Sequence, residues 1–319
     1  MFRVVYNRKK SLDEVKEAYA KIIEKDIDKE WGNLVAKYPK MKKAIAGKMK
    51  ASDLLTAEFE KLVDVYFRYI SLKGELDKKE GPKMHAQAEK IFSYGSYKEK
   101  IAGFFMNDDY GFEVHNCYYC ELEDVSKYKD SKGREKRQFQ IEHVLDKGTC
   151  PMVGLSLFNF VPSCGHCNSQ GVKGNNTIGD TKDEIKKLSP TIPTYNMENK
   201  VIFVVNYLNP LASDFDMANH PDDYEIGFYY LDKLYEKSVK LFDLSNRYNK
   251  KNKKTQLLKV LENRLKHPYD DLVKTLGSEK AADALMEDLL QLQASKENHW
   301  QMNKARWDIA RNSFMPVIL

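Results

Sequence analysis

The sequence predicts a mixed α+β protein that is mostly helical and has a short non-helical region near its middle. Apolar residues recur at helical spacings on both sides of that region. Residues 111–179 lose this period and concentrate cysteine, glycine, asparagine and histidine. We therefore expect an N-terminal helical region (1–108), a central region (109–180) and a C-terminal, mainly helical region (181–319).

The helical signals of the N-terminal region lie in residues 11–105. Ser11 followed by Glu14 is a capping-box pattern, and an apolar-periodic segment follows over residues 15–23. Residues 51–71 place apolar side chains three and four positions apart, which predicts an amphipathic helix.

The C-terminal region is expected to be helical over residues 220–319. Two apolar stripes predict buried helix faces, and their members are Leu257, Leu258, Leu261 and Leu265 on one helix and Ala281, Leu285, Leu289 and Leu292 on another. The longest apolar run, residues 201–205, is only as long as a strand and falls far short of the roughly 18 residues that cross a bilayer. The N-terminus lacks an apolar signal core of about 7–15 residues, so we expect a cytoplasmic protein without a membrane partner.

The net charge of +5 is too mild to indicate a partner by itself. The basic residues are concentrated locally, however: six of them against two acids lie in residues 127–137, and a second run begins at Lys250. Such a run is either a solvated loop or a surface for phosphates. The residues that we expect to contact nucleic acid are Lys132, Arg134, Lys136, Arg137 and Lys173.

Four of the five cysteines are spaced for a metal site. Cys117 and Cys120 form one C-x-x-C pair, and Cys164 and Cys167 form another. Two such turns can place four thiolates around one ion, and thiolates select zinc. Residues 121–163 lie between the pairs, a wider gap than the roughly 15–20 residues of common zinc ribbons. A redox role is the competing interpretation, but a redox C-x-x-C normally occurs once and beside a βαβ pattern.

An odd number of cysteines in a chain expected to be cytoplasmic disfavours a disulfide framework. The remaining Cys150 is interpreted as a buried, inert thiol. His115 and His166 lie beside the cysteine pairs and are interpreted as neighbours of the zinc site or surface residues, with a role as extra ligands as the alternative.

The residues between and after the cysteine pairs form a second group of polar side chains on a predicted strand and the segment that follows it. Residues 138–145 (QFQIEHVL) alternate in part and are rich in strand formers, which places Glu142 and His143 on a predicted strand. The segments IEHVLDK and NFVPSCGHCNSQGVKG together resemble the HNH, or ββα-metal, nucleases. The resemblance covers less than a fifth of the chain.

The resemblance implies a zinc-stabilised ββα-metal core and a role for each matching residue. His143 matches the general base, and Asn159 matches the asparagine that fixes the loop around that base. Glu142 matches a ligand of the catalytic metal, although the family more often has aspartate there. Asn168 matches the second metal ligand, carried on a helix, and Asp146 stands where many members have proline.

Phosphodiester hydrolysis needs these residue types. An imidazole can take a proton from water, and a divalent cation can stabilise the charge that develops on the phosphate. Oxygen ligands from Glu142 and Asn168 suit Mg²⁺ or Mn²⁺, while the sulfur site holds zinc. We therefore expect an endonuclease that cuts double-stranded DNA. An RNase with the same motifs and a catalytically silent, zinc-stabilised nucleic-acid-binding module are the alternatives.

A finer resemblance adds a protein partner. The IEH triplet, the paired cysteines and the segments LNPLASDFD and LFDLSNRYNKKNKK are similar to HNH nuclease subunits of bacterial antiphage systems of the Septu and retron-associated type. In those systems the nuclease works with an ATPase, so the resemblance implies an ATPase partner protein.

Overall fold

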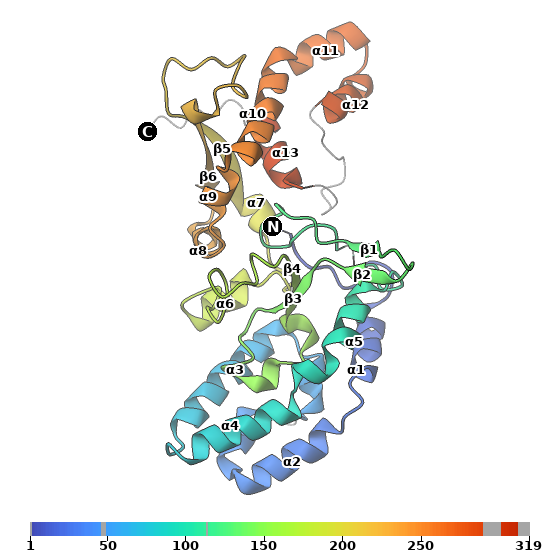
Figure 1. Cartoon of the computed structure of the whole chain (residues 1–319), viewed down its shortest axis with the longest axis vertical. Coiled ribbons are helices and arrows are strands. Elements are labelled where there is room, and N and C mark those ends of the chain that lie inside the picture. Colours follow the sequence, from blue (N-terminus) through green and yellow to red (C-terminus); the bar gives the residue numbers. More distant parts are fainter. Residues whose placement is uncertain (1, 46–48, 113, 290–300, 312–319) are drawn as a thin grey trace. The chain divides into compact units, whose positions relative to one another are not determined.

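The computed structural model describes residues 2–45, 49–112, 114–289 and 301–311. Over these residues it consists of helices, turns and two-stranded antiparallel sheets (Figure 1), which confirms the α+β, mostly helical class. The chain divides into two compact units. We call residues 3–118 and 125–195 the N-terminal unit, and residues 1–2, 119–124 and 196–319 the C-terminal unit. Apart from residues 1–2 and 119–124, the expected N-terminal and central regions thus share one unit, and the main division falls after residue 195.

The N-terminal unit is built around helices that follow the predicted pattern. The capping box of Ser11 and Glu14 opens the first helix, as predicted. The predicted helix over 51–71 appears as a 3-10 turn, η2 (Ser52–Leu55), followed by a long α-helix. The α-helices of this unit are α1 (Leu12–Lys21), α2 (Ile27–Lys37), α3 (Phe59–Gly74), α4 (Glu80–Ile91), α5 (Tyr94–Met106) and α6 (Lys182–Leu188).

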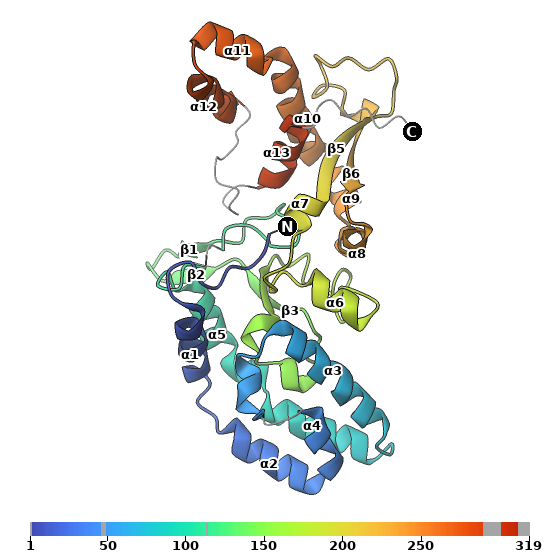
Figure 2. The ribbon, with the colours of Figure 1, turned by 180° about the vertical axis from the view of Figure 1, so that it is seen from behind.

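The core of this unit lies around α3, whose buried face includes Leu62, Val63 and Tyr69. The short helices η3 (Pro151–Val153) and η4 (Leu157–Asn159) pack against α3, and η3 also packs against α4. Figure 2 shows α2, α3 and α4 together from the opposite side. The loop that carries Asn159 is therefore fixed to the helical core.

Two hairpins complete the N-terminal unit. β1 (Lys127–Lys129) pairs with β2 (Glu135–Arg137), and β3 (Gln140–His143) pairs with β4 (Phe160–Ser163). The strand predicted over 138–145 is thus present over four of those residues, and His143 lies opposite Phe160.

The expectation that a helix carries Asn168 is wrong. Residues 165–175 form turns. Glycine destabilises helices, and this segment contains Gly165, Gly171 and Gly174, the last with a left-handed φ of 46°. The ββ part of the expected core is therefore present, and an α-helix at Asn168 is not.

The C-terminal unit contains a sheet that the helical expectation for 220–319 missed. β5 (Val201–Tyr207) includes the predicted strand-sized run and pairs with β6 (Tyr224–Tyr230). The helices of this unit are α7 (Met197–Lys200), α8 (Glu236–Leu241), α9 (Leu244–Tyr248), α10 (Lys251–Lys266), α11 (Tyr269–Leu276), α12 (Glu279–Leu289) and α13 (Asn303–Arg311). No described helix combines the length and the apolarity that a bilayer crossing requires.

The two predicted stripes of this unit fare differently. Leu257, Leu258 and Leu261 of α10 are buried, as predicted. On α12 the predicted stripe is confirmed only in part: Ala281 is exposed, Leu285 and Leu289 are half-buried, and the fully buried residues are Ala282 and Met286. Its last member, Leu292, lies outside the described residues.

Candidate functional site

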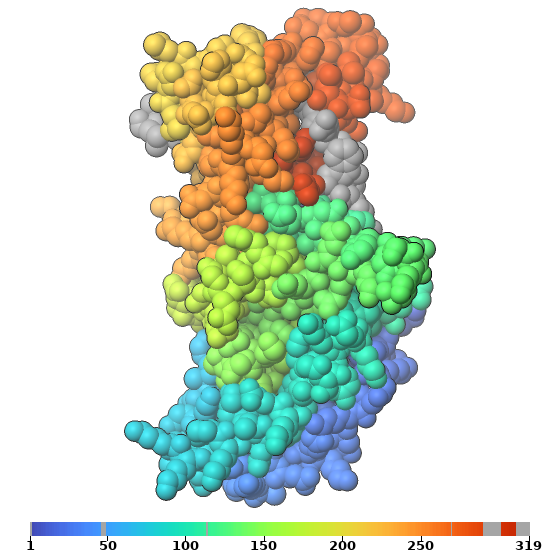
Figure 3. All heavy atoms as spheres, viewed as in Figure 1, coloured from blue at the N-terminus to red at the C-terminus, as the bar shows by residue number. Residues whose placement is uncertain are grey.

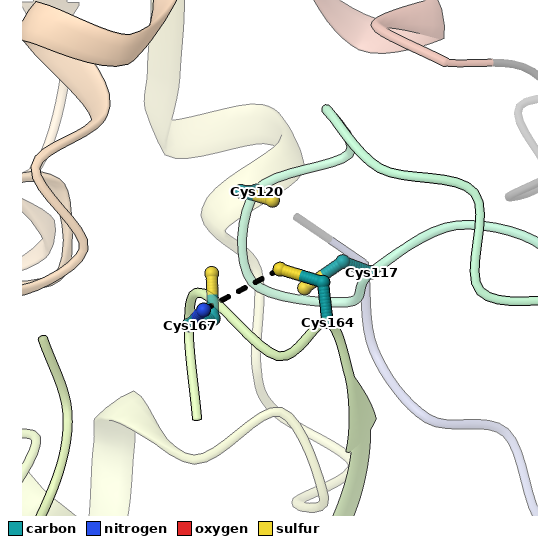
Figure 4. Close-up of side chains that lie close together, drawn as sticks. All are labelled: Cys117, Cys120, Cys164 and Cys167. Carbon is teal, nitrogen blue, oxygen red and sulfur yellow. Dashed lines mark hydrogen bonds between the residues drawn. The ribbon is translucent and has the colours of Figure 1, made fainter. Parts of the chain in front are cut away.

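The two C-x-x-C pairs come together as one cluster of four buried cysteines. The sulfur atoms of Cys117, Cys120, Cys164 and Cys167 all lie within 4.8 Å of one another (Figure 4). A tetrahedral zinc with Zn–S bonds of about 2.3 Å would separate its sulfurs by about 3.8 Å. The cluster therefore fits a four-sulfur zinc site, and among the described residues neither His115 nor His166 belongs to it.

Hydrogen-bond donors from one cysteine turn and from α9 (Leu244–Tyr248) contact these cysteines. The backbone N–H of Cys167 donates to the sulfur of Cys164 at 3.4 Å, as Figure 4 shows. The guanidinium of Arg247, which is 4% exposed, donates to the sulfur of Cys120 at 3.4 Å. The hydroxyl of Tyr248 donates to the carbonyl oxygen of Cys120 at 2.7 Å. The two donors to sulfur stabilise thiolate charge, which a four-cysteine site accumulates, while Tyr248 fixes the backbone of Cys120.

His143 ends β3 and its ring is buried. Its Nε2 lies 3.1 Å from the carbonyl oxygen of Gly154, so Nε2 carries the proton and donates. The rings of Tyr94 and Phe160 pack edge-on against the imidazole, with centroids 4.6 and 5.0 Å away. Burial lowers the pKa of His143 to about 3, and the nearby charge of Lys147 adds to this shift. The imidazole is therefore neutral at physiological pH, with its proton on Nε2 and a lone pair on Nδ1.

Asn159 holds together the loop that faces His143. Its side-chain oxygen accepts the backbone N–H of Leu145 at 2.7 Å. Its side-chain nitrogen donates to the carbonyl oxygens of Leu145 and Val153, each at 3.0 Å. Asn159 has no exposed surface. These three bonds connect the segment after β3 to Val153. The carbonyl oxygen of the next residue, Gly154, accepts the hydrogen bond from the imidazole.

Glu142 and Lys173 form a buried ion pair. The Lys173 Nζ lies 2.9 Å from Glu142 Oε1, and the two side chains are 1% and 2% exposed. The same Nζ donates to the carbonyl oxygen of His143 at 3.0 Å. The expectation that Lys173 contacts nucleic acid at the surface is therefore corrected, because its ammonium is held in the interior.

Asn168 lies in the turn after β4 and is partly exposed. Its side-chain nitrogen donates to the side-chain oxygen of Gln140 at 2.7 Å. Gln140 and Glu142 are two positions apart on β3, so their side chains leave the same face of that strand. The structure thus places Asn168 on the face of β3 from which Glu142 leaves, and Lys173 holds Glu142 there.

The basic residues before β3 lie on the β1–β2 hairpin, which is the protruding green lobe of Figure 3. Lys132, Arg134 and Lys136 are exposed. Arg137 is mostly covered: it donates to the carbonyl oxygen of Phe139 at 3.0 Å and pairs with Glu99 at 3.2 Å. Three of the four predicted side chains therefore face solvent, and Arg137 fixes the hairpin to its surroundings.

Two of the four lysines in the second basic run, at the start of α10, make contacts within the fold, while Lys250 and Lys251 are exposed. Lys254 is buried and donates to the carbonyl oxygen of Tyr224 at 3.0 Å. Lys253 donates to the carbonyl oxygen of Leu122 at 3.3 Å. A solvated loop is therefore the wrong interpretation of these two lysines.

Lys147 is a neighbour of His143 that sequence reasoning did not single out. Its side chain is exposed, lies over the ring of Tyr94 at 5.6 Å from the centroid, and is close enough to His143 to lower the pKa of the imidazole. The signal was available, because Lys147 follows His143 by four residues in the segment IEHVLDK.

Cys150 is fully buried outside the cluster, and burial raises the pKa of its thiol to about 12. It is therefore a neutral thiol, which agrees with the predicted inert role.

No protein-family model, curated protein or solved structure matches the chain.

Proposed function

We propose that the protein is an endonuclease that hydrolyses phosphodiester bonds of DNA, with His143 as its general base. The observation that carries this proposal is the bracing of the loop after β3. Asn159 makes hydrogen bonds to the backbone of Leu145 and Val153, and the carbonyl oxygen of Gly154 in the same loop accepts a hydrogen bond from the Nε2–H of His143. A general base needs one ring nitrogen fixed as a donor and the other left with its lone pair.

The protonation state of His143 is compatible with this role. The neutral imidazole can accept a proton on Nδ1, although a pKa of about 3 would make it a weak base. A phosphate anion beside the ring would favour the imidazolium and move its pKa back toward neutrality. The exposed Lys147 is our candidate for holding that phosphate near His143.

The cofactor part of the proposal has two components. Zinc at Cys117, Cys120, Cys164 and Cys167 would stabilise the fold and take no part in hydrolysis. A catalytic Mg²⁺ or Mn²⁺ at Glu142 and Asn168 does not fit the residues as they are arranged here, because Lys173 occupies the Glu142 carboxylate. We therefore assign no step of the reaction to a divalent ion.

The test is cleavage of supercoiled plasmid, linear double-stranded DNA and RNA by the zinc-loaded protein, with Mg²⁺ or Mn²⁺ present. His143→Ala should lower the cleavage rate by about 10²–10⁴-fold, the usual contribution of a general base. His166→Ala is the matched control, because His166 is exposed and outside the cysteine cluster. Wild-type rates in a His143→Ala protein free of contaminating nuclease would contradict the proposal. Preference for RNA would move the substrate to the alternative class.

The catalytically silent nucleic-acid-binding module is a second candidate. The observation that favours it is the burial of both central groups, since His143 is 7% exposed and Glu142 is paired with Lys173. This candidate predicts binding through Lys132, Arg134 and Lys136 without cleavage under any metal condition. A protein that binds DNA and cuts none of the three substrates would establish it.

We also propose an ATPase partner protein, as in the antiphage systems that the sequence resembles. The C-terminal unit supports a protein contact, because the segment between β5 and β6 exposes Leu208, Leu211 and Phe215 by 58%, 90% and 62%. Large exposed apolar side chains that lie close together in sequence favour an interaction site over a solvated loop. Loss of co-purification with the partner in Leu211→Asp, and its retention in Lys132→Ala, would support this part.

A further inference from the structure

We infer that Lys173 is a tethered cation that competes with a divalent metal ion for the Glu142 carboxylate. The inference rests on the proposed function in one respect, the assignment of Glu142 as a metal ligand. It begins from the disagreement described above: where the resemblance implies a metal ion, the chain supplies an ammonium group of its own.

The contacts of Lys173 are those that a hard cation would make. Its Nζ lies 2.9 Å from Glu142 Oε1 and 3.0 Å from the carbonyl oxygen of His143. Carboxylate and carbonyl oxygens are also the ligands that Mg²⁺ and Ca²⁺ take in proteins. Lys173 therefore occupies two oxygens of the Glu142–His143 dipeptide that a divalent ion could use.

Burial of Lys173 and Glu142 strengthens the competition between the ammonium and a metal ion. Both side chains are almost completely removed from water, at 1% and 2% exposure. A buried carboxylate is costly without a nearby cation, so the ammonium of Lys173 stabilises the charge of Glu142. A divalent ion at Oε1 would lie close to this ammonium, and in a buried position the repulsion between the two charges weakens the binding of the ion.

The segment that carries Lys173 is a turn at the surface of the unit. Lys173 lies among turns whose neighbours Gln170, Gly171 and Asn175 are exposed. A Cβ on Gly171 would meet nothing within 4 Å, so there is open space beside that residue. The lysine thus reaches inward from a surface turn and is not part of a core helix.

The experiment measures Mn²⁺ binding to the zinc-loaded protein by electron paramagnetic resonance, with no substrate and no activity readout. Lys173→Met keeps the length of the side chain and removes its charge. We expect this variant to bind Mn²⁺ with a Kd at least about tenfold lower than that of the wild type, because the competing ammonium is gone. Adding Glu142→Gln to Lys173→Met should abolish the gain. Lys187→Met removes an exposed lysine of α6 that has no part in the proposed site, and it should produce no gain.

Stability provides a second readout. Lys173→Met leaves the buried Glu142 carboxylate without its ammonium, so its melting temperature should fall and should recover in millimolar Mn²⁺ by more than the wild type shifts. The inference is overturned if Lys173→Met gains no Mn²⁺ affinity, if the gain survives Glu142→Gln, or if a destabilised Lys173→Met is not rescued by Mn²⁺. A failure of the nuclease proposal would appear in the cleavage assay instead and would leave these binding results standing.

Discussion

The two hairpins of the N-terminal unit differ in what holds them together. The β1–β2 hairpin is exposed and charged, and its turn depends on Asp130, which accepts the backbone N–H groups of Lys132 and Arg134. The β3–β4 hairpin is buried over seven of its eight strand residues, and only Gln140 is exposed. The first hairpin is therefore maintained by local polar contacts and the second by the core.

This difference predicts where a polar side chain can be changed. In the exposed hairpin a lost contact is replaced by water, so the fold is little affected. Around the buried hairpin, a polar group that loses its partner keeps the full cost of desolvation. Substitutions that look equivalent in the sequence should thus separate clearly in stability, and the following experiments test that separation from the largest expected effect to the smallest.

The largest effect is expected at the cysteine cluster that follows β4. Cys164→Ser should lose the bound zinc and lower the free energy of unfolding by several kilocalories per mole, because the binding energy of a structural metal is folding energy. Zinc content by elemental analysis and denaturant unfolding measure the two outcomes. Cys150→Ser is the control and should retain zinc with a much smaller loss. A Cys164→Ser protein with unchanged zinc and stability would show that these sulfurs hold no metal.

Asn159→Ala should come next. It removes three hydrogen bonds to the backbone of Leu145 and Val153 in a fully buried position. We expect a loss of about 3 kcal/mol in the free energy of unfolding, because buried backbone groups lose their partners. Asn176→Ala is the matched control, since Asn176 is exposed and makes one long bond of 3.4 Å to Val172. Equal losses of unfolding free energy in the two variants would show that the buried hydrogen bonds of Asn159 do not stabilise the fold.

His143 should make the buried hairpin sensitive to acid. Its pKa is about 3 in the folded protein against an ordinary value of 6.5, so the unfolded chain takes up the proton first. The neutral ring therefore favours the folded state fully above pH 6.5, and this contribution is lost as the pH falls from 6.5 toward 3. The loss should approach about 1.4 kcal/mol for each pH unit. Unfolding free energies of the wild type and His143→Gln, measured over this range, should converge as the pH falls. Parallel pH profiles of the two proteins would show that folding does not lower the pKa of His143.

The smallest effect on stability is expected in the exposed hairpin. Lys132→Ala, Arg134→Ala and Lys136→Ala combined should leave the unfolding free energy nearly unchanged. If the hairpin binds nucleic acid, affinity for all sequences should fall, and the log–log salt slope should flatten by roughly one for each lost phosphate contact. Arg137→Ala is the internal comparison and should destabilise more than any of the three, because Arg137 is tied to Glu99 and Phe139. Unchanged binding and salt slope in the triple variant would make the run a solvated surface.

Features encoded in neighbouring residues could be predicted from the sequence. The capping box at Ser11 and Glu14 and the strand around Glu142 and His143 depend on local patterns. The signal for β6 was equally local, since Tyr224 and Ile226 are buried while Glu225 between them is exposed, and the helical interpretation of 220–319 overlooked it.

Features that depend on partners distant in the sequence could not be predicted in this way. Lys173 appeared to be a phosphate contact because nothing near it in the sequence shows that Glu142 would be its partner. The stripe on α12 was misplaced by one residue because packing decides it: Met286 belongs to a buried cluster with Val260 of α10 and Ala310 of α13. Local spacing gives the period of a helix, and tertiary contacts select the face.

The burial of Cys150 means that a thiol reagent can be used to follow zinc release from the cysteine cluster. Thiol reagents attack the thiolate, and a pKa of about 12 leaves almost none of it on Cys150 at neutral pH. The other four of the five cysteines belong to the cluster, where a bound zinc ion would shield their sulfurs. Alkylation of the native protein with a chromogenic thiol reagent should therefore report zinc release alone, with no background from Cys150. Its time course would give the rate at which the metal leaves the folded chain.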